Sequence, residues 1–510
     1  MGRAIGIDLG TTYSAISVMQ ADGKPIILPN SEGQNITPSV VLFPETNGNG
    51  EEPLVGDMAK HSAVTSPLDV AQFVKRQMGD PNWRFISTNG QSYTAEEVSA
   101  IILRKLKADA ELALGETVTD AVITVPAYFD DARRTATKQA GRIAGLNVLR
   151  VLNEPTAAAM SYGLNFEQQG TVLVYDLGGG TFDVTIMTIS NGEFDVLATD
   201  GNRNLGGFDF DNRIANYVIG ELKAQGVTRD ISEDDALVAE IREKSELAKK
   251  SLTNITQATI VLTVDGKQYR IKITREQFEN MTKDLLKTTE EVVADTLDAA
   301  GKTWASIDHL LLVGGSTRMP MVRELMTKIS GKKPELNVNP DEAVALGAAI
   351  QAYISLKDQG EPEPLLNEIV LSISEVTSQA LGVIMLNEAD KEENFVVIPR
   401  NAKIPTKGKQ QAVTVVDQQE SINVQVTQGE DREVRYVVVI GSKDIPIPRY
   451  PKGAPFTVMY AYDIDQTVYV ELYDETARRT VGTFEIDRAL NMNEEAVKNA
   501  VQRIGGLTIS

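Results

Sequence analysis

The sequence predicts two α/β lobes of the same construction, followed by an antiparallel β domain and a short C-terminal helix. Three observations predict this fold. A strand-turn-strand pattern occurs twice, and a strand-turn-helix pattern also occurs twice, in the same order. After Tyr353 the spacing of apolar residues changes from helical to alternating. At 510 residues the chain is too long for a single core, which agrees with several domains.

The repeated hairpin is the first element. The stretch "GIDLGTTYSAISVM" (6–19) aligns without a gap with "VYDLGGGTFDVTIM" (174–187), so that Asp8 pairs with Asp176. Each stretch predicts two strands joined by a tight turn whose tip carries an acid, glycine and hydroxyl groups. A structural hairpin explains one such turn well, whereas the matched pair favours a shared function.

The second repeat is a strand followed by a helix. Residues 120–141, "DAVITVPAYFDDARRTATKQAG", and 308–331, "DHLLLVGGSTRMPMVRELMTKISG", each predict a strand, a turn with Pro or Gly-Gly, and a basic amphipathic helix. Two lobes built alike, at 1–170 and 171–357, account for both repeats. Chance recurrence of a common pattern is the alternative, and two pairs in the same order disfavour it.

After residue 357 the composition and the periodicity of the sequence change. Residues 358–379 are predicted to be a linker, because the stretch "LKDQGEPEPLL" is acidic, contains proline and lacks periodicity. From 380 to 488, runs such as "SINVQVTQ" and "TVYVELYD" alternate with period two, which predicts an antiparallel β domain. Within 489–510, "NMNEEAVKNAVQRIGG" has asparagine caps and a Gly-Gly end, which predict one short helix.

Composition excludes several classes of function. The net charge of −21 argues against binding to nucleic acid or to anionic membranes. No apolar stretch approaches about twenty residues and no signal peptide is recognisable, so we expect a cytoplasmic protein. Absence of cysteine and the presence of only two histidines argue against thiolate and polyhistidine sites. Any hydrolysis would therefore rest on carboxylates, cationic side chains, hydroxyl groups and Mg²⁺.

The hairpin turns have the chemistry of a phosphate site. Glycines let main-chain N–H groups approach phosphate oxygens closely, and two facing turns could grip a phosphate chain from both sides. The aspartates would repel phosphate directly, so each needs a cation between, a role that hydrated Mg²⁺ fits. A third turn, Val313–Arg318, is suited to close approach to a base or ribose; Arg318 either stacks on the base or is simply solvated.

Four stretches together resemble the Hsp70 chaperones of the DnaK type: "GIDLGTTYS", "ITVPAYFDDARRTATKQAGRIAGLNVLRVLNEPTAAAMSYGL", "VYDLGGGTFDVTI" and "LLVGGSTRMPMV". The resemblance is dense over 1–357 and looser over 380–488, through "IPRNAKIPTK" and "QGE". It implies a two-lobed, actin-like ATPase domain fused to a β-sandwich that binds extended apolar peptides. The implied cofactors are ATP or ADP with Mg²⁺, and also K⁺. The implied partners are unfolded polypeptides, a J-domain co-chaperone and a nucleotide-exchange factor.

The resemblance also implies roles for individual residues. The residues implied in catalysis are Lys75, Asp8, Glu154, Asp176, Thr181 and Asp183, of which Asp8, Asp176 and Glu154 contact the water shell of Mg²⁺. Nucleotide binding is implied for Gly10, Thr11, Thr12, Tyr13, Gly178, Gly179, Gly180, Thr181, Glu246, Lys249, Lys250, Thr253, Gly314, Gly315, Ser316, Arg318 and Asp341. Pro126 and Arg134 correspond to the interdomain relay, and Val383, Leu386 and Ile422 to peptide-contacting positions. Lys75 would orient the attacking water, and slow turnover is expected because no strong general base is present.

The chain departs from the family pattern in three places. Only the short helix within 489–510 stands where the family has a helical lid, so we expect a bound peptide to leave quickly. Ser372 and Ser374 interrupt the apolar linker, which would weaken coupling between domains. The loop "LNEADKEEN" at the pocket rim is longer and more acidic, and the three peptide-contacting positions could equally be ordinary sandwich core.

Two functions remain open on these grounds. The first is an ATP-driven chaperone, and the second is a related ATPase whose β domain is a dedicated adaptor for one partner. A small-molecule kinase or a filament-forming actin relative is disfavoured, because neither accounts for the appended β domain.

Overall fold

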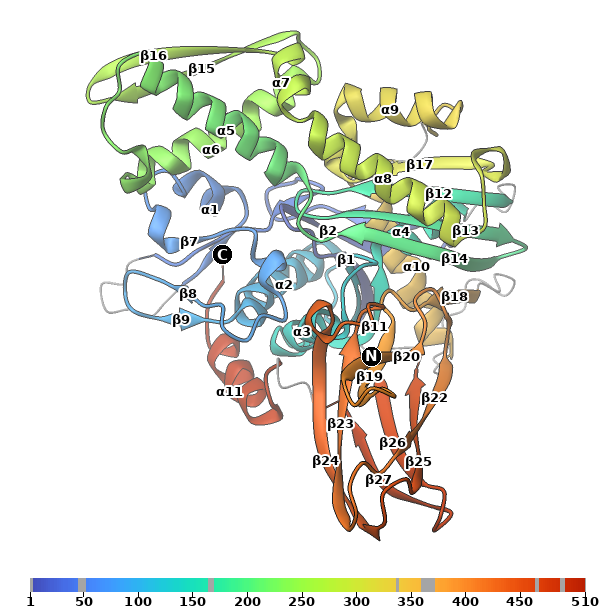
Figure 1. Cartoon of the computed structure of the whole chain (residues 1–510). Helices are drawn as coiled ribbons and strands as arrows, with labels where there is room; N and C mark the ends of the chain where they lie inside the picture. Colours follow the sequence, from blue (N-terminus) through green and yellow to red (C-terminus); the bar gives the residue numbers. More distant parts are fainter. Residues whose placement is uncertain are drawn as a thin grey trace.

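The computed structural model describes residues 3–44, 52–163, 169–335, 339–358, 372–463, 467–486 and 491–509. Most of the predicted linker, 359–371, lies outside these ranges. Figure 1 shows two α/β lobes with an elongated β domain attached beneath them. The predicted fold class, two α/β lobes followed by a β-sandwich and a C-terminal helix, is confirmed.

The first lobe is built on a mixed sheet in the order β11-β10-β1-β2-β3. The two strands of the predicted hairpin, β1 and β2, are antiparallel. Strand β10 pairs in parallel with β1, and β11 pairs in parallel with β10. The bounds are β1 (Arg3–Asp8), β2 (Tyr13–Met19), β3 (Pro25–Leu28), β10 (Val118–Val125) and β11 (Asn147–Asn153). The first turn, which joins β1 to β2, thus lies at the edge of the sheet where the parallel strands β1, β10 and β11 end.

The second lobe repeats this topology in the order β17-β12-β13-β14. The hairpin partners β12 and β13 are antiparallel, and β17 adds in parallel beside β12, as β10 does beside β1. The bounds are β12 (Gly170–Leu177), β13 (Phe182–Ser190), β14 (Glu193–Asn202) and β17 (His309–Val313). Both repeats predicted from the sequence are therefore confirmed in strand order.

Two helices join the lobes by lying between their sheets. Helices α4 (Glu154–Gly163) and α10 (Ala343–Asp358) share one apolar cluster with strands of both lobes. Their approach is so close that a Cβ on Gly347 would lie 1.8 Å from the carbonyl oxygen of Ala157. Similarly, a Cβ on Gly6 of β1 would lie 2.1 Å from the main-chain nitrogen of Ala349. These contacts fix the distance between the two sheets, and hence between their turns.

The outer layers differ between the lobes. In the first lobe, α2 (Ala95–Leu114) and α3 (Asp131–Ile143) pack with the sheet in one core. In the second lobe, several helices and one hairpin rise above the sheet (Figure 1). They are α5 (Gly207–Ala224), α6 (Asp235–Leu252), β15 (Gln257–Val264), β16 (Lys267–Thr274), α7 (Arg275–Met281), α8 (Lys283–Ala299) and α9 (Pro320–Ser330). The smaller elements opposite them are β4 (Thr37–Pro38), β5 (Val41–Leu42), β6 (Leu54–Val55), α1 (Asp57–Ser62), β7 (Val70–Ala71), β8 (Phe85–Ile86) and β9 (Ser92–Tyr93).

The β domain consists of two antiparallel sheets in the orders β20-β19-β23-β24 and β22-β25-β26-β27. Alternating side chains of both sheets enclose a common apolar core, as the period of two predicts. The bounds are β19 (Leu381–Leu386), β20 (Glu392–Ile398), β22 (Thr406–Val413), β23 (Gln419–Gln428), β24 (Val438–Tyr450), β25 (Pro455–Tyr462), β26 (Val468–Asp474) and β27 (Arg479–Glu485).

A strand inside the predicted linker connects the two parts. Strand β18 (Ser372–Val376) adds in parallel to β14 of the second lobe and pairs on its other side with β21 (Lys403–Ile404). The main-chain N–H of Ser372 donates to the carbonyl of Gly192 (3.1 Å). Because this docking uses main-chain hydrogen bonds, the serines do not prevent it, and Val376 still reaches the apolar cluster between the lobes.

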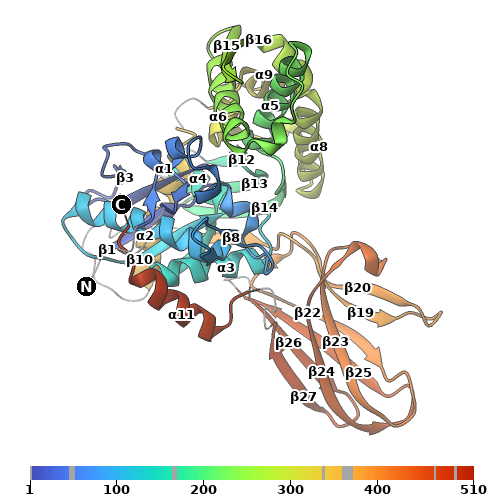
Figure 2. The same cartoon turned by 90° about the vertical axis from the view of Figure 1, so that its left-hand side faces the viewer.

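The C-terminal helix α11 (Glu494–Gly505) packs against the first lobe (Figure 2). Arg142 of α3 pairs with Glu494 (2.9 Å), and the side chain of Gln139 donates to the carbonyl of Met492 (2.7 Å). Arg104 of α2 donates to the carbonyl of Ile504. Across the described ranges, no helix has both the length and the apolar character needed to cross a membrane.

The glycine contact between α4 and α10 gives a first prediction. Gly347→Ala should destabilise the protein by about 1–3 kcal/mol, because the added methyl group meets main-chain atoms that cannot move aside. Gly220→Ala in α5 is the matched control: its Cβ meets nothing within 4 Å, so it should stabilise the helix by about 0.5–1 kcal/mol. Urea denaturation of both variants measures the difference, and equal effects would contradict the packing described.

Candidate functional site

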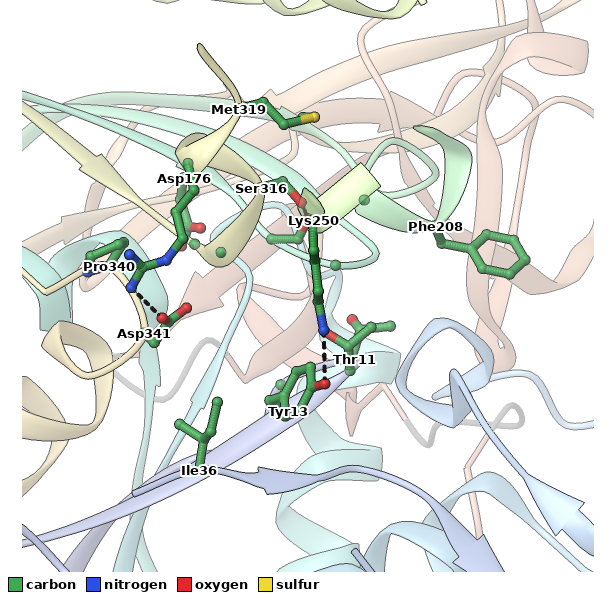
Figure 3. Close-up of a pocket in the computed structure, with 18 of the residues that line it drawn as sticks. Thr11, Tyr13, Ile36, Asp176, Phe208, Lys250, Ser316, Met319, Pro340 and Asp341 are labelled. Atoms are coloured by element: carbon green, nitrogen blue, oxygen red, sulfur yellow. Dashed lines mark hydrogen bonds and ion pairs between the residues drawn. The ribbon is translucent and has the colours of Figure 1, made fainter. Parts of the chain in front are cut away.

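A cavity of about 710 Å³ lies between the two lobes, and both contribute to its wall (Figure 3). It brings together residues far apart in the sequence. The predicted residues that line it are Asp8, Gly10, Thr11, Thr12, Tyr13, Lys75, Glu154, Asp176, Gly178, Gly179, Thr181, Glu246, Lys249, Lys250, Thr253, Gly314, Gly315, Ser316, Arg318 and Asp341. Gly180 and Asp183 do not line it; Gly180 contacts Thr11 of the opposite turn, and Asp183 is buried.

The two hairpin turns face each other across the cavity. A Cβ on Gly179 would lie 2.3 Å from the hydroxyl oxygen of Thr12, and one on Gly180 would lie 2.5 Å from the methyl carbon of Thr11. A side chain at either glycine would have to displace the threonine opposite. Glycine is therefore required in the second turn by the approach of the first.

The start of α5 supports the second turn from behind. The main-chain N–H of Gly207 donates to the carbonyl of Gly178 (2.9 Å), and that of Phe208 to the carbonyl of Gly179 (2.8 Å). A Cβ on Gly206 would lie 2.5 Å from the main-chain nitrogen of Gly180. This segment was not among the predicted site residues, although its two adjacent glycines at the start of an amphipathic helix are a recognisable signal.

Four acids and one lysine gather at the floor of the cavity. Lys75 is 6% exposed and donates to the carboxylate of Glu154. Asp183 is 1% exposed and accepts the main-chain N–H of Tyr128 (2.9 Å), which places it beneath the floor. Burial, followed by the charge of Glu154, raises the pKa of Asp8 to about 7 and that of Asp183 to about 8. The same causes raise the pKa of Asp176 well above its usual range.

Burial is the first cause of these raised pKa values, the charge of Glu154 adds to it, and Lys75 opposes it. A bound cation would favour the ionised carboxylates, so the donor set fits Mg²⁺ held by Asp8 and Asp176. Among the described residues, no three acidic or histidine side chains are placed to bind a metal ion together. Water molecules and phosphate oxygens would have to supply the remaining ligands.

The upper rim of the cavity is closed by charged side chains. Lys60 of α1 pairs with Glu246 of α6 (2.8 Å), so this ion pair joins the two lobes. Glu246 also pairs with Lys250 (2.7 Å), and both lysines donate to the hydroxyl of Tyr13 (2.9 and 3.0 Å; Figure 3 shows the Lys250 contact). Burial acts to raise the pKa of Glu246, but the two lysines prevail and lower it to about 2.

The third turn packs directly on the second. Gly314 has φ 81°, and a Cβ there would lie 2.4 Å from the carbonyl oxygen of Leu177. The hydroxyl of Ser316 donates to the carbonyl of Gly178 (2.9 Å). Arg318 is half exposed and pairs with Asp341 (2.5 Å; Figure 3), so it is an ion-paired residue of the cavity wall.

Of the two predicted relay residues, Arg134 is connected to β18. Arg134 is buried and donates to the side-chain oxygen of Asn153 (2.5 Å), and the Asn153 amide donates to Glu375 of β18. Pro126 opens the turn that follows β10, where its carbonyl accepts the N–H of Phe129 (3.0 Å). Arg134 is thus connected to the docked strand through one side chain.

A second cavity, of about 1000 Å³, lies in the β domain. Of the three predicted peptide-contacting residues, Leu386 and Ile422 line it, and Leu386 is 42% exposed. Val383 is 1% exposed and belongs to the core between the sheets. In this structure Val383 therefore packs inside the sandwich, which was the alternative left open by the sequence.

Comparison with known protein families gives one result. A family model described as Hsp70 protein matches residues 4–504. The match includes both lobes, the docked strand β18, the β domain and most of α11.

The buried acids predict how stability depends on pH. Folded-state pKa values of about 7 and 8, above the ordinary value of 3.8, mean that folding takes up protons between these limits. This contribution to stability is present below about pH 4 and is lost as the pH rises through about 7 to 8. Thermal denaturation of the ligand-free protein should therefore show a midpoint that falls between about pH 4 and 8 and levels off above about pH 8.

Asp183→Asn should flatten this dependence, because the amide does not ionise. The exposed residue Asp298 provides the control: Asp298→Asn should leave the slope as it is in the unaltered protein. If the thermal midpoints of the unaltered protein and of Asp183→Asn fall with pH to the same extent, the pKa of Asp183 is not raised.

Proposed function

The chain belongs to the Hsp70 family, and from this premise we propose that it is an ATP-dependent chaperone. The cleft between the lobes hydrolyses ATP, and the reaction controls the binding and release of extended apolar peptide segments by the β domain. One observation carries the proposal: two glycine turns meet across a cavity whose floor holds buried acids and a lysine. Unfolded polypeptides are the proposed clients, and a J-domain protein and a nucleotide-exchange factor are the proposed partners.

Phosphate binding is assigned to the two turns. The main-chain N–H groups of Gly10–Thr12 and Gly178–Thr181 would bind the phosphate oxygens from opposite sides. Asp8 and Asp176 would hold hydrated Mg²⁺, whose charge offsets that of the phosphates when it is bound. Lys250, Ser316 and Arg318, which also line the cavity, would contact the adenosine.

Hydrolysis is assigned chiefly to positioning and electrostatics. Lys75, fixed by its ion pair with Glu154, would orient a water molecule for attack on the γ-phosphate and stabilise the charge that develops. Thr181 would donate to the transferred phosphoryl group. The ion pair between Lys60 and Glu246 joins the lobes at the rim of the cavity, so its opening would precede product release.

Coupling between nucleotide and peptide is assigned to the docked strand β18. It extends the sheet of the second lobe and reaches Arg134 through Asn153. The β domain also contacts β14 directly: Arg400 pairs with Asp200 (2.6 Å), and Lys403 pairs with Asp195. A nucleotide-dependent change in the lobes would thus reach the β domain through main-chain and ionic contacts.

The proposed role of Lys75 predicts a selective loss of hydrolysis. Lys75→Ala should lower the single-turnover rate about 10²–10³-fold, because a buried cation beside the reacting phosphate is lost. ATP affinity should change by less than about threefold, since the turns remain. The exposed residue Lys328 provides the control variant Lys328→Ala. A parallel loss of affinity and rate in Lys75→Ala would argue for a structural role.

The proposed peptide site predicts stimulation of ATP turnover by unrelated apolar peptides. Ile422→Asp should weaken peptide binding about tenfold or more, because one buried apolar contact is worth about 1.5–3 kcal/mol. Thr483→Asp, an exposed position on β27, is the control. Fluorescence anisotropy of labelled peptides measures the affinity. If no unrelated peptide stimulates turnover, the dedicated adaptor replaces the chaperone as the function.

A further inference from the structure

One arginine reaches across the cleft to the second turn. Arg76 follows Lys75 in the 3₁₀ turn Val74–Gln77 of the first lobe. Its Nε and Nη2 donate to the carbonyl oxygen of Gly180 at 2.9 and 2.7 Å. Nη2 also donates to the carboxylate of Asp209 in α5 (2.5 Å), and the Arg76 side chain is only 13% exposed. The guanidinium therefore ties the first lobe to the turn of the second.

This contact fixes the direction of a neighbouring amide. The carbonyl of Gly180 and the N–H of Thr181 belong to one peptide unit, and in a planar trans peptide they point in opposite directions. Two donors on the carbonyl hold that oxygen toward Arg76, so the Thr181 N–H is held on the opposite side. Glycine at 180 has a wider range of main-chain conformations than other residues, so these hydrogen bonds restrict the peptide. Lysine cannot supply the same planar fork.

A pair of aromatic rings joins the two lobes beside the same guanidinium. The Arg76 guanidinium lies 5.0 Å from the ring centre of Phe208, a residue of α5 that lines the cavity (Figure 3). Phe73 of the first lobe contacts that ring, with centroids 4.5 Å apart. Phe73 adopts φ 58°, a left-handed conformation that is costly for a bulky side chain and is found mainly at functional sites. The lobes are therefore joined here by an ionic and an aromatic contact.

The first turn is held in another way. The carbonyl of Thr12 accepts the main-chain N–H of Ser39 (2.9 Å), a contact within the first lobe. Support for the second turn thus depends on both lobes, whereas this support for the first turn does not. Opening of the cleft would release the Gly180 carbonyl but leave the Thr12 carbonyl in place.

We propose that Arg76 is a positioning residue for the ATPase reaction. It orients the Thr181 amide toward the transferred phosphoryl group, and it does so only while the lobes are closed. The contact between Phe73 and Phe208 secures this closed arrangement. Closure of the cleft and completion of the phosphate site are then a single event. The inference rests on the proposed ATPase function and adds the residues that link closure to hydrolysis.

The test compares Arg76→Lys with Arg84→Lys. Arg84 is an exposed arginine of the same lobe that also donates to main-chain carbonyls, those of Pro81 and Trp83, and so it is a matched control. Single-turnover hydrolysis at saturating Mg·ATP should fall about 10- to 100-fold in Arg76→Lys, whereas affinity for a fluorescent ATP analogue should change less than about threefold. Arg84→Lys should behave as the unaltered protein.

A second readout does not depend on hydrolysis. Hydrogen exchange of the ligand-free protein should become faster over 174–187 in Arg76→Lys but stay unchanged over 6–19, the equivalent hairpin of the first lobe. Phe208→Leu should also lower the hydrolysis rate and make exchange over 174–187 faster, but by smaller amounts than Arg76→Lys. Phe208→Tyr, which keeps the aromatic ring, should match the unaltered protein in both measurements. The Phe208 pair decides the matter if Arg76→Lys does not fold.

Three outcomes would overturn the inference. They are an unchanged hydrolysis rate, unchanged exchange over 174–187, or a loss of affinity as large as the loss of rate. If the unaltered protein itself does not hydrolyse ATP, the proposed function fails together with the catalytic part of the inference. The exchange experiment then still decides whether Arg76 orients the second turn.

Discussion

The close approach of two glycine turns across the cleft is the constraint on which the rest of this structure depends. Gly179 and Gly180 meet the side chains of Thr12 and Thr11 at distances that leave no room for a Cβ. This approach is set where α4 and α10 lie between the two sheets with glycine-to-backbone contacts. A change in that packing would therefore move the turns, although it touches neither.

The surroundings of the turns are organised by the same constraint. The start of α5 and the third turn both bond to carbonyls of the second turn, through Phe208 and Ser316. Beneath them, acids with raised pKa values crowd around one lysine, and this unfavourable charge is what a hydrated cation would relieve. Strand β18 links the second turn to the β domain. It pairs with β14, and β12 of the same sheet leads into the second turn. The cleft and the β domain are thus parts of one hydrogen-bonded framework.

Sequence alone predicted the elements whose information is local or repeated. The two hairpins and the two strand-helix units were evident because each pattern occurs twice, and the β domain because its period is two. Contacts between distant segments were not predictable. Lys60 and Arg76 were not among the predicted site residues, because only folding brings them to Glu246 and Gly180. Likewise, the alternation of apolar residues could not decide which face of β19 lines the second cavity, and Val383 lies in the core of the β domain. The serines of β18 did not reveal that this strand docks, because docking uses main-chain hydrogen bonds; weaker coupling between the domains stays a prediction.

A crystal structure with Mg²⁺ and a non-hydrolysable ATP analogue tests the central claim most directly. The account predicts the triphosphate between Gly10–Thr12 and Gly178–Thr181, with a hydrated Mg²⁺ between Asp8 and Asp176. Phosphates bound by one turn alone, or a nucleotide bound outside the cavity between the lobes, would contradict it.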